Sequence, residues 1–199
     1  MAERVILASA STSRAHLLAA AGVAAQVQPS SFDEAALKRR LAAEGAAAGA
    51  CALALAEGKA QQVAACAGDA LVIGADQLLA VGSEWFDKPE DLAAARSQLR
   101  ALRGRSHELA TAACVVRAGT VLWQSVSVSR LAMRAFSDAF LDAYLAAEGA
   151  AVLGSVGAYR LEGRGAQLFE RVEGDYFAIL GLPLIELLGF LRARGALAD

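Results

Sequence analysis

The sequence predicts an α/β fold in which helices flank a mixed, twisted sheet. Short apolar runs at residues 5–8 and 71–76 are typical of buried strands. Residues 108–116 and 120–130 alternate on either side of an Ala-Gly turn, as the two strands of a hairpin do. Between these runs, apolar residues recur at helical spacing. Strands that alternate with helices along a chain indicate the α/β class.

The expected strands are apolar or alternating runs that stop at glycine, proline or polar turns. They are residues 5–8, 71–76, 78–81, 84–86, 108–116, 120–130, 159–161, 168–172 and 176–180. Gly82-Ser83 separates the third run from the fourth and predicts a hairpin. The second run ends in Asp76, so we expect this carboxylate at the end of a buried strand.

The expected helices begin at a capping residue or a proline and carry apolar side chains on one face. The first follows the polar turn at residues 9–14 and ends at Gly22. The others lie within residues 37–63, divided around Gly45 or Gly49, from Pro89 to Gly104, over residues 138–148 with Ser137 as the cap, and from Pro183 onward.

Length and composition suit a protein with a substantial core. The chain has 199 residues, of which 56% are hydrophobic, enough for one domain or two small lobes. It contains neither an internal repeat nor a low-complexity linker. We therefore expect a single domain over residues 1–199, and the pattern assigns no boundary between two lobes within it.

Charge and cysteine content argue against several partners and compartments. The net charge of −2, without a long run of like charges, makes binding to nucleic acid improbable. The uncharged stretch at residues 45–56 is twelve residues long, too short for a bilayer, and the N-terminus has no signal-peptide core. Cys51, Cys66 and Cys114 are odd in number and widely spaced, which argues against a disulfide framework. We expect a cytoplasmic protein with no membrane partner.

The turn at residues 9–14 is the best candidate for a phosphate-binding element. The sequence contains neither a GxxxxGK[ST] loop nor a GxGxxG motif after a strand. Ser9, Ser11 and Arg14 instead place hydroxyls and a cation at the expected start of a helix, where the free N–H groups and the dipole favour an anion. A plain serine cap is the other interpretation of this turn.

Acidic and lysine side chains form a second candidate group. A carboxylate such as Asp76 is costly to bury unless it is paired or binds a metal. The expected hairpin would return Lys88 to its side, and Glu34, in a polar loop, could join it as a ligand of a hard divalent cation. Only three of the nineteen basic residues are lysines, so Lys59 and Lys88 are candidates for a compact positive charge against phosphate.

Other roles fit some of these residues equally well. Asp76 would also suit a turn, and Glu34 would suit the first turn of a helix as an ordinary favourable charge. Glu162 lies in a glycine-rich turn at residues 161–165, which fits either a ligand-reading loop or a solvated turn.

Taken together in order and spacing, the short blocks of this chain resemble the Maf proteins. The matching blocks are residues 7–11 with Arg14, 33–34, 59–60, 73–76, 88–89, 102–107, 157–159 with 162–163, 174–176 and 181–184. The resemblance covers nearly the whole chain. It implies a fold related to the inosine triphosphatases, with two lobes around a cleft. It also implies hydrolysis of a nucleoside triphosphate to monophosphate and pyrophosphate, a divalent cation such as Mg²⁺ or Mn²⁺, a house-cleaning role in the cytoplasm and, often, a dimer.

Residue by residue, the resemblance implies a role for each member of the candidate site. Asp76 matches the proton acceptor and a metal ligand, with Glu34 as the other metal ligand. Lys59 and Lys88 match catalytic positions that offset phosphate charge, and Ser9, Ser11 and Arg14 match positions that bind the substrate.

Two departures from the family pattern concern substrate choice. Ser13 stands where the family usually has the first arginine of a Ser-Pro-Arg-Arg run, and it matches neither specificity type. Gln77 and Glu162 are similar to the 7-methyl-GTP type rather than to the thymidine- and uridine-triphosphate type. The base preference therefore stays open.

Two other functions also stay open. A nucleotide-sensing regulator of septum formation would bind a triphosphate without turnover, and a phosphatase would release orthophosphate. Product analysis distinguishes all three.

Overall fold

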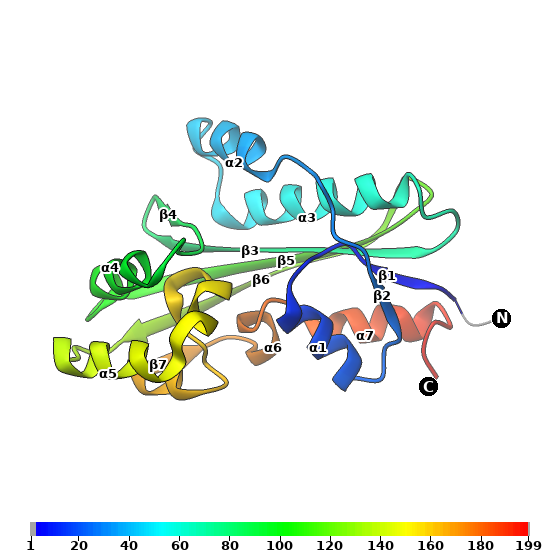
Figure 1. Cartoon of the computed structure of the whole chain (residues 1–199). Helices are drawn as coiled ribbons and strands as arrows, with labels where there is room; N and C mark the ends of the chain where they lie inside the picture. Colours follow the sequence, from blue (N-terminus) through cyan, green and yellow to red (C-terminus); the bar gives the residue numbers. More distant parts are fainter. Residues whose placement is uncertain (1–2, 199) are drawn as a thin grey trace. The chain divides into compact units, whose positions relative to one another are not determined.

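The computed structural model describes residues 3–198 and contains two compact units. The first unit comprises the chain up to Gln77, residues 111–127, and the chain from Asp175 onward. The second comprises residues 78–110 and 128–174. Seven strands form one mixed sheet with flanking helices, which confirms the predicted α/β class (Figure 1).

The sheet has the strand order β2-β1-β3-β5-β6-β7, and β4 pairs with β3. β1 runs parallel to both β2 and β3, whereas β4 and β7 run antiparallel to their neighbours. The bounds are β1 Val5–Leu7, β2 Ala25–Val27, β3 Leu71–Val81, β4 Glu84–Phe86, β5 Ser106–Arg117, β6 Thr120–Met133 and β7 Phe169–Glu173. Both predicted hairpins are confirmed; Ala118 and Gly119, between β5 and β6, have positive φ angles, as a tight hairpin turn requires.

The helices begin at capping side chains in most cases. Ser11, Asp33, Asp91, Ser137 and Asp175 each accept a hydrogen bond from a backbone N–H of the first turn. The bounds are α1 Thr12–Ala20, α2 Glu34–Ala43, α3 Ala48–Ala64, α4 Leu92–Leu102, α5 Asp138–Glu148, α6 Tyr176–Ile179 and α7 Leu184–Ala193, with short 3-10 helices at Gly149–Gly154, Val156–Ala158 and Arg164–Leu168. No helix within residues 3–198 is long and apolar enough to cross a bilayer.

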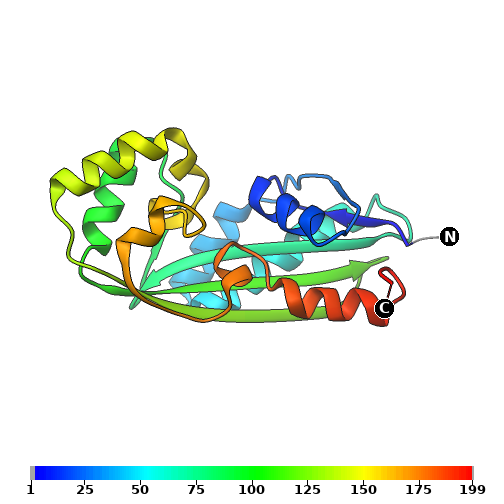
Figure 2. The same ribbon diagram turned by 90° about the horizontal axis from the view of Figure 1, so that it is seen from below.

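In the first unit, helices cover both faces of the sheet (Figures 1 and 2). Leucines of α1 and α7 pack with Leu7 and Ile73 in one buried cluster. On the opposite face, α3 lies against β3 at Gly74. A Cβ atom at this glycine would come within 2.1 Å of the Ala56 carbonyl oxygen, so the close approach of helix and strand requires glycine.

In the second unit, α4 packs against α5 and the first two 3-10 helices. His107 of β5 is buried there, with its Nε2 atom 2.8 Å from the hydroxyl of Tyr159. Phe169 packs edge-on against Tyr159, at 4.8 Å between ring centroids. His107 is therefore a core residue of the second unit.

The buried histidine makes a prediction about acid stability. Burial lowers the pKa of His107 from 6.5 to about 4. Between these two values the unfolded chain binds more protons than the folded chain, so the free energy of unfolding falls as pH falls from 6.5 to 4. The loss is about 3 kcal/mol. His107→Gln keeps a polar partner for Tyr159 and removes the titration. Urea unfolding at pH 7 and 4.5 should show a smaller pH dependence for this variant; parallel pH curves would refute the prediction.

Several local predictions were wrong. Asp76 lies within β3, not at its end, because the strand continues through Leu78 and Ala80. Residues 159–161 form no strand, and residues 176–179 form the helix α6, because Asp175 caps that turn and outweighs the β propensity of its aromatic residues. The helix expected from Pro89 begins at Leu92, where Asp91 provides the cap.

Candidate functional site

Lys59 joins the two acidic candidates of the first unit. Its Nζ atom lies 2.5 Å from Oδ1 of Asp76 and 2.7 Å from Oε2 of Glu34. The Lys59 and Asp76 side chains are only 7% and 12% exposed, whereas Glu34 is 49% exposed. Pairing with the ammonium offsets the desolvation of Asp76, which explains how a carboxylate occupies the interior of an apolar strand.

The backbone places Lys59 there through the close packing of α3 on β3. Gly74 lies two residues before Asp76 on the same face of the strand, and a Cβ atom at Gly74 would also lie 2.8 Å from that of Ala60. Because α3 packs closely on β3 at this point, the Lys59 side chain contacts Asp76 on the same strand.

Glu34 is held by the segment that precedes it. It is the first residue of α2 rather than part of a loop, and Asp33 caps the helix. Phe32 packs on Gly58 of α3, where a Cβ atom would lie 2.6 Å from its ring. Gln62, one helical turn further on, accepts hydrogen bonds from Ser30 Oγ and Ser31 N at 2.6 and 2.7 Å. The residues around Lys59 on α3 thus also fix the position of Glu34.

The predicted phosphate-binding turn begins beside Asp76. β1 pairs Leu7 with Ile73, and Ala8 N donates to the Ile73 carbonyl oxygen at 2.8 Å, so the chain leaves the sheet next to the Asp76 segment. Ser11 caps α1 and accepts from Arg14 N at 3.4 Å. Ser9 Oγ in turn accepts from Ser11 N at 3.2 Å. The hydroxyl groups therefore organise the first turn of α1, and their O–H protons are left for other acceptors.

Arg14 is a buried cation at the same turn. It donates from Nη1 to Ser9 Oγ at 3.1 Å and from Nε to the Gly181 carbonyl oxygen at 2.8 Å. Desolvation lowers the pKa of Arg14, while the negative charges of Asp76 and Glu34 act in the opposite direction. A guanidinium has five N–H groups, so most remain for an anionic ligand after these two bonds.

The three predicted specificity residues lie in different settings. Ser13 is exposed in the first turn of α1. Gln77, half-buried on β3, donates from Nε2 to Thr111 and to two carbonyl oxygens of α6. Glu162 belongs to the second unit, where its Oε1 atom accepts from Arg160 Nε at 3.1 Å. Arg160 also contacts Glu148, whose side chain is only 8% exposed.

Eight of the ten predicted site residues belong to the first unit, where hydrogen bonds and ion pairs join Ser9 with Arg14 and join Lys59 with Glu34 and Asp76. Lys88 and Glu162 belong to the second unit. The hairpin that precedes Lys88 is confirmed, with Leu79 opposite Phe86. That this hairpin returns Lys88 to the side of Asp76 stays a prediction.

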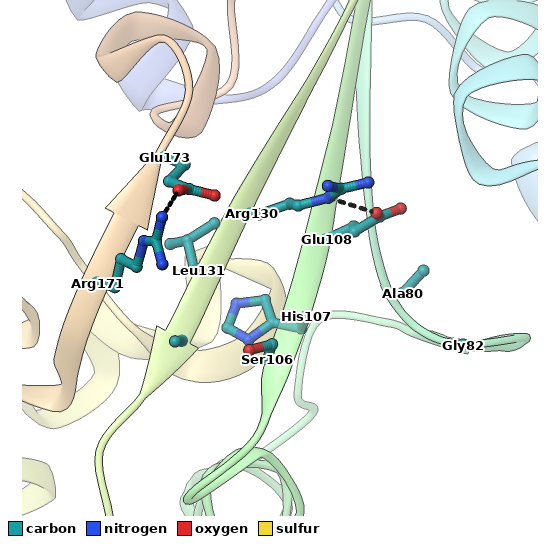
Figure 3. A pocket seen from close by; sticks show the side chains of 10 residues that line it. Ala80, Gly82, Ser106, His107, Glu108, Arg130, Leu131, Arg171 and Glu173 are labelled. Atoms are coloured by element: carbon teal, nitrogen blue, oxygen red, sulfur yellow. Dashed lines mark hydrogen bonds and ion pairs between the residues drawn. The ribbon is translucent and has the colours of Figure 1, made fainter.

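A pocket of about 400 Å³ in the second unit contains none of the predicted site residues. Its rim carries two ion pairs, Arg130 with Glu108 at 3.0 Å and Arg171 with Glu173 (Figure 3). Each positive charge is matched by a negative one, so the rim lacks the excess positive charge that a triphosphate site needs.

Sequence reasoning missed the residues that hold the site in place. Gln62, Phe32 and Thr111 act through contacts between segments distant in the chain, and no local motif marks them. Arg160 had a weak signal, since it lies two residues before Glu162 at the edge of a glycine-rich turn.

The fold and this site define a class of α/β proteins. In this class a lysine contacts two carboxylates, and the same unit contains a serine-rich helix N-terminus with a buried arginine. The family model described as Maf-like protein matches residues 4–194. The chain belongs to the Maf family.

Relatives match along nearly the whole chain. A protein from Granulibacter bethesdensis, named nucleoside triphosphate pyrophosphatase, is 51% identical over 98% of each chain. A protein from Rhizobium meliloti, named 7-methyl-GTP pyrophosphatase, is 50% identical over 97% of each chain. One from Paramagnetospirillum magneticum, named nucleoside triphosphate pyrophosphatase, is 51% identical over 96% of this chain and 99% of its own.

Proposed function

We propose that this protein hydrolyses a nucleoside triphosphate to the monophosphate and pyrophosphate. The observation that carries the proposal is the contact of Lys59 with both Asp76 and Glu34, next to the Ser9–Arg14 turn. The two carboxylates, the ammonium and the hydroxyl and N–H donors of that turn all lie in one unit, which supports a site with a base, a cation and anion-binding groups. The names of relatives about 50% identical over nearly the whole chain support the same activity.

In the proposed reaction, Asp76 accepts the proton of the attacking water. The water oxygen bonds to the α-phosphorus, the bond from that phosphorus to the α,β-bridging oxygen breaks, and pyrophosphate leaves with the bridging oxygen. Lys59 holds the Asp76 carboxylate in position and, with Arg14 and the N–H groups of α1, offsets the negative charge of the phosphates. Lys88 is proposed as a further phosphate contact.

The residues present fit a hard divalent cation, Mg²⁺ or Mn²⁺. Lys59 contacts one oxygen each of Asp76 and Glu34, so each carboxylate has a second oxygen to offer. No group of three or more acidic, His or Cys side chains suited to a metal occurs in the described part of the chain. Magnesium is commonly held by one or two carboxylates together with substrate phosphates, which suits this pair. When bound, the cation would neutralise phosphate charge.

Base selection is proposed to involve Gln77, Glu162 and Ser13. A carboxylate such as Glu162 only accepts hydrogen bonds, which suits the adjacent N–H donors of a guanine edge. The 7-methyl-GTP pyrophosphatase name of several relatives agrees with a substrate of this kind. The three unpaired cysteines favour a reducing compartment such as the cytoplasm.

Product analysis tests the activity. Purified protein should convert a triphosphate from a panel of standard, methylated and deaminated nucleotides into monophosphate and pyrophosphate in the presence of Mg²⁺ or Mn²⁺. Chelation by EDTA should abolish turnover, and added Mg²⁺ should restore it. Release of orthophosphate would instead identify a phosphatase, and binding without turnover would identify the nucleotide-sensing regulator.

A further inference from the structure

The amide nitrogen of Gln77 is surrounded by acceptors. It lies 2.8 Å from Thr111 Oγ1, 2.9 Å from the Ala178 carbonyl oxygen and 3.1 Å from the Ile179 carbonyl oxygen. Carbonyl oxygens only accept hydrogen bonds, so Oε1 of the amide would be repelled if it occupied this place. The two carbonyls therefore determine which end of the amide faces α6.

Thr111 completes this arrangement. Its side chain is buried on β5, with the residue 1% exposed, and its hydroxyl donates to the Ala178 carbonyl oxygen at 2.8 Å. With its proton committed, the hydroxyl can only accept from Gln77. One N–H of the amide is thus bound by Thr111, and the other is shared by the two carbonyls.

These donors converge on the C-terminal end of α6, where the Ala178 carbonyl oxygen also accepts from Gly181 N at 2.9 Å. This helix has only four residues, Tyr176–Ile179, and the last carbonyls of a helix lack partners within it. Gln77 and Thr111 provide donors to them from two adjacent strands, β3 and β5. Both N–H groups of Gln77 are consequently used inside the protein, and Oε1 is the only polar atom that the side chain can offer a ligand.

We propose that Thr111 is a specificity-positioning residue that makes Gln77 an acceptor-only contact. The inference rests on the proposed function, in which Gln77 faces the base. An acceptor-only side chain favours a base edge with adjacent N–H donors, such as N1–H and the 2-amino group of guanine. It disfavours adenine, whose N1 is an acceptor. Thr111 itself touches no substrate and acts through Gln77.

Thr111→Val tests the inference because valine has the same shape without the hydroxyl. The Gln77 amide then loses one of the hydrogen bonds that hold its nitrogen toward α6, so rotation of the amide, which would present a donor to the ligand, costs less free energy. We expect the preference for GTP over ATP to fall about fivefold, the effect of one neutral hydrogen bond. The change should lie mainly in KM. Thr111→Ser keeps the hydroxyl and should keep the preference.

Binding measurements separate this inference from the hydrolase proposal. Dissociation constants of GTP and ATP are measured by calorimetry for Asp76→Asn and Asp76→Asn/Thr111→Val, and turnover is measured for the wild type and the two Thr111 variants. A preference that falls in the valine variants and persists with serine supports the inference. An equal loss for both nucleotides, or no initial preference for GTP, would overturn it. If the wild type shows no turnover but its binding preference for GTP depends on Thr111, the hydrolase proposal is refuted and the inference about Thr111 is supported.

Discussion

Asp76→Asn should reduce kcat about 100- to 10,000-fold, the usual contribution of a general base. Asparagine has nearly the same shape, and its Oδ1 atom can still accept a hydrogen bond from Lys59, which lies 2.5 Å from the carboxylate. Lys59 also keeps its contact with Glu34. The substitution therefore removes the proton acceptor while leaving the packing of α3 on β3 intact. Steady-state release of pyrophosphate measures the loss.

The matched control is Asp69→Asn. Asp69 lies in the same unit and loses the same charge, but its side chain is 91% exposed and its ion pair with Arg117 is long, at 3.9 Å. Its kcat and melting temperature should stay close to the wild-type values. If Asp76→Asn turned over substrate at a rate near the wild type, the assignment of Asp76 as the base would be wrong. If it failed to fold, the expectation that asparagine preserves the packing of α3 on β3 would be wrong instead.

Much of the fold follows from local patterns in the sequence. The apolar run at residues 5–8 marks β1, and Ser137 marks the start of α5, because burial and capping act within a few residues. The strand β2 at residues 25–27 was not predicted, because a short, partly exposed strand has few apolar residues to mark it. The helix α6 was missed because its cap competes with strand-forming aromatic residues.

The division into units could not be predicted, for a physical reason. The boundaries fall within β3, near the middle of β5 and within β6, as well as just before Asp175, so no linker separates the units. A continuous strand carries no change of composition at such a point. Boundary prediction depends on exposed, flexible connections, and this chain passes between its units through ordered strands.

The candidate site was predictable in its chemistry but not in its contacts. Local pattern singled out Asp76 as an unusual acid and Lys59 as one of few lysines, yet it did not indicate that they touch. Their contact depends on the approach of α3 to β3 at Gly74, which is a property of packing between distant segments. The same holds for Gln62, which contacts the segment before Glu34 from thirty-one residues away.

Lys59→Met should have the other large effect, on stability as well as on activity. Methionine fills the space of the lysine stem but leaves Asp76 as a buried carboxylate without its cation. Removing one partner of a buried ion pair typically costs 3–5 kcal/mol. We expect about 3 kcal/mol, because Glu34 is half exposed and regains water. Turnover should fall at least about 100-fold, since the variant also loses a charge that offsets phosphate.

A second substitution tests the cause of this instability. Lys59→Met/Asp76→Asn lacks the unpaired buried carboxylate. Its free energy of unfolding should therefore exceed that of Lys59→Met by at least about 1 kcal/mol. Arg40→Met, which removes an exposed cation from α2, is the control and should change stability little. Urea unfolding of these three variants and the wild type at pH 7 provides the comparison. If Asp76→Asn further destabilised the Lys59→Met protein, the two side chains would be acting independently. In that case the ion pair with Lys59 would not explain how Asp76 is accommodated in the interior of β3. The proposal that Lys59 positions Asp76 as the base would then lose its structural support.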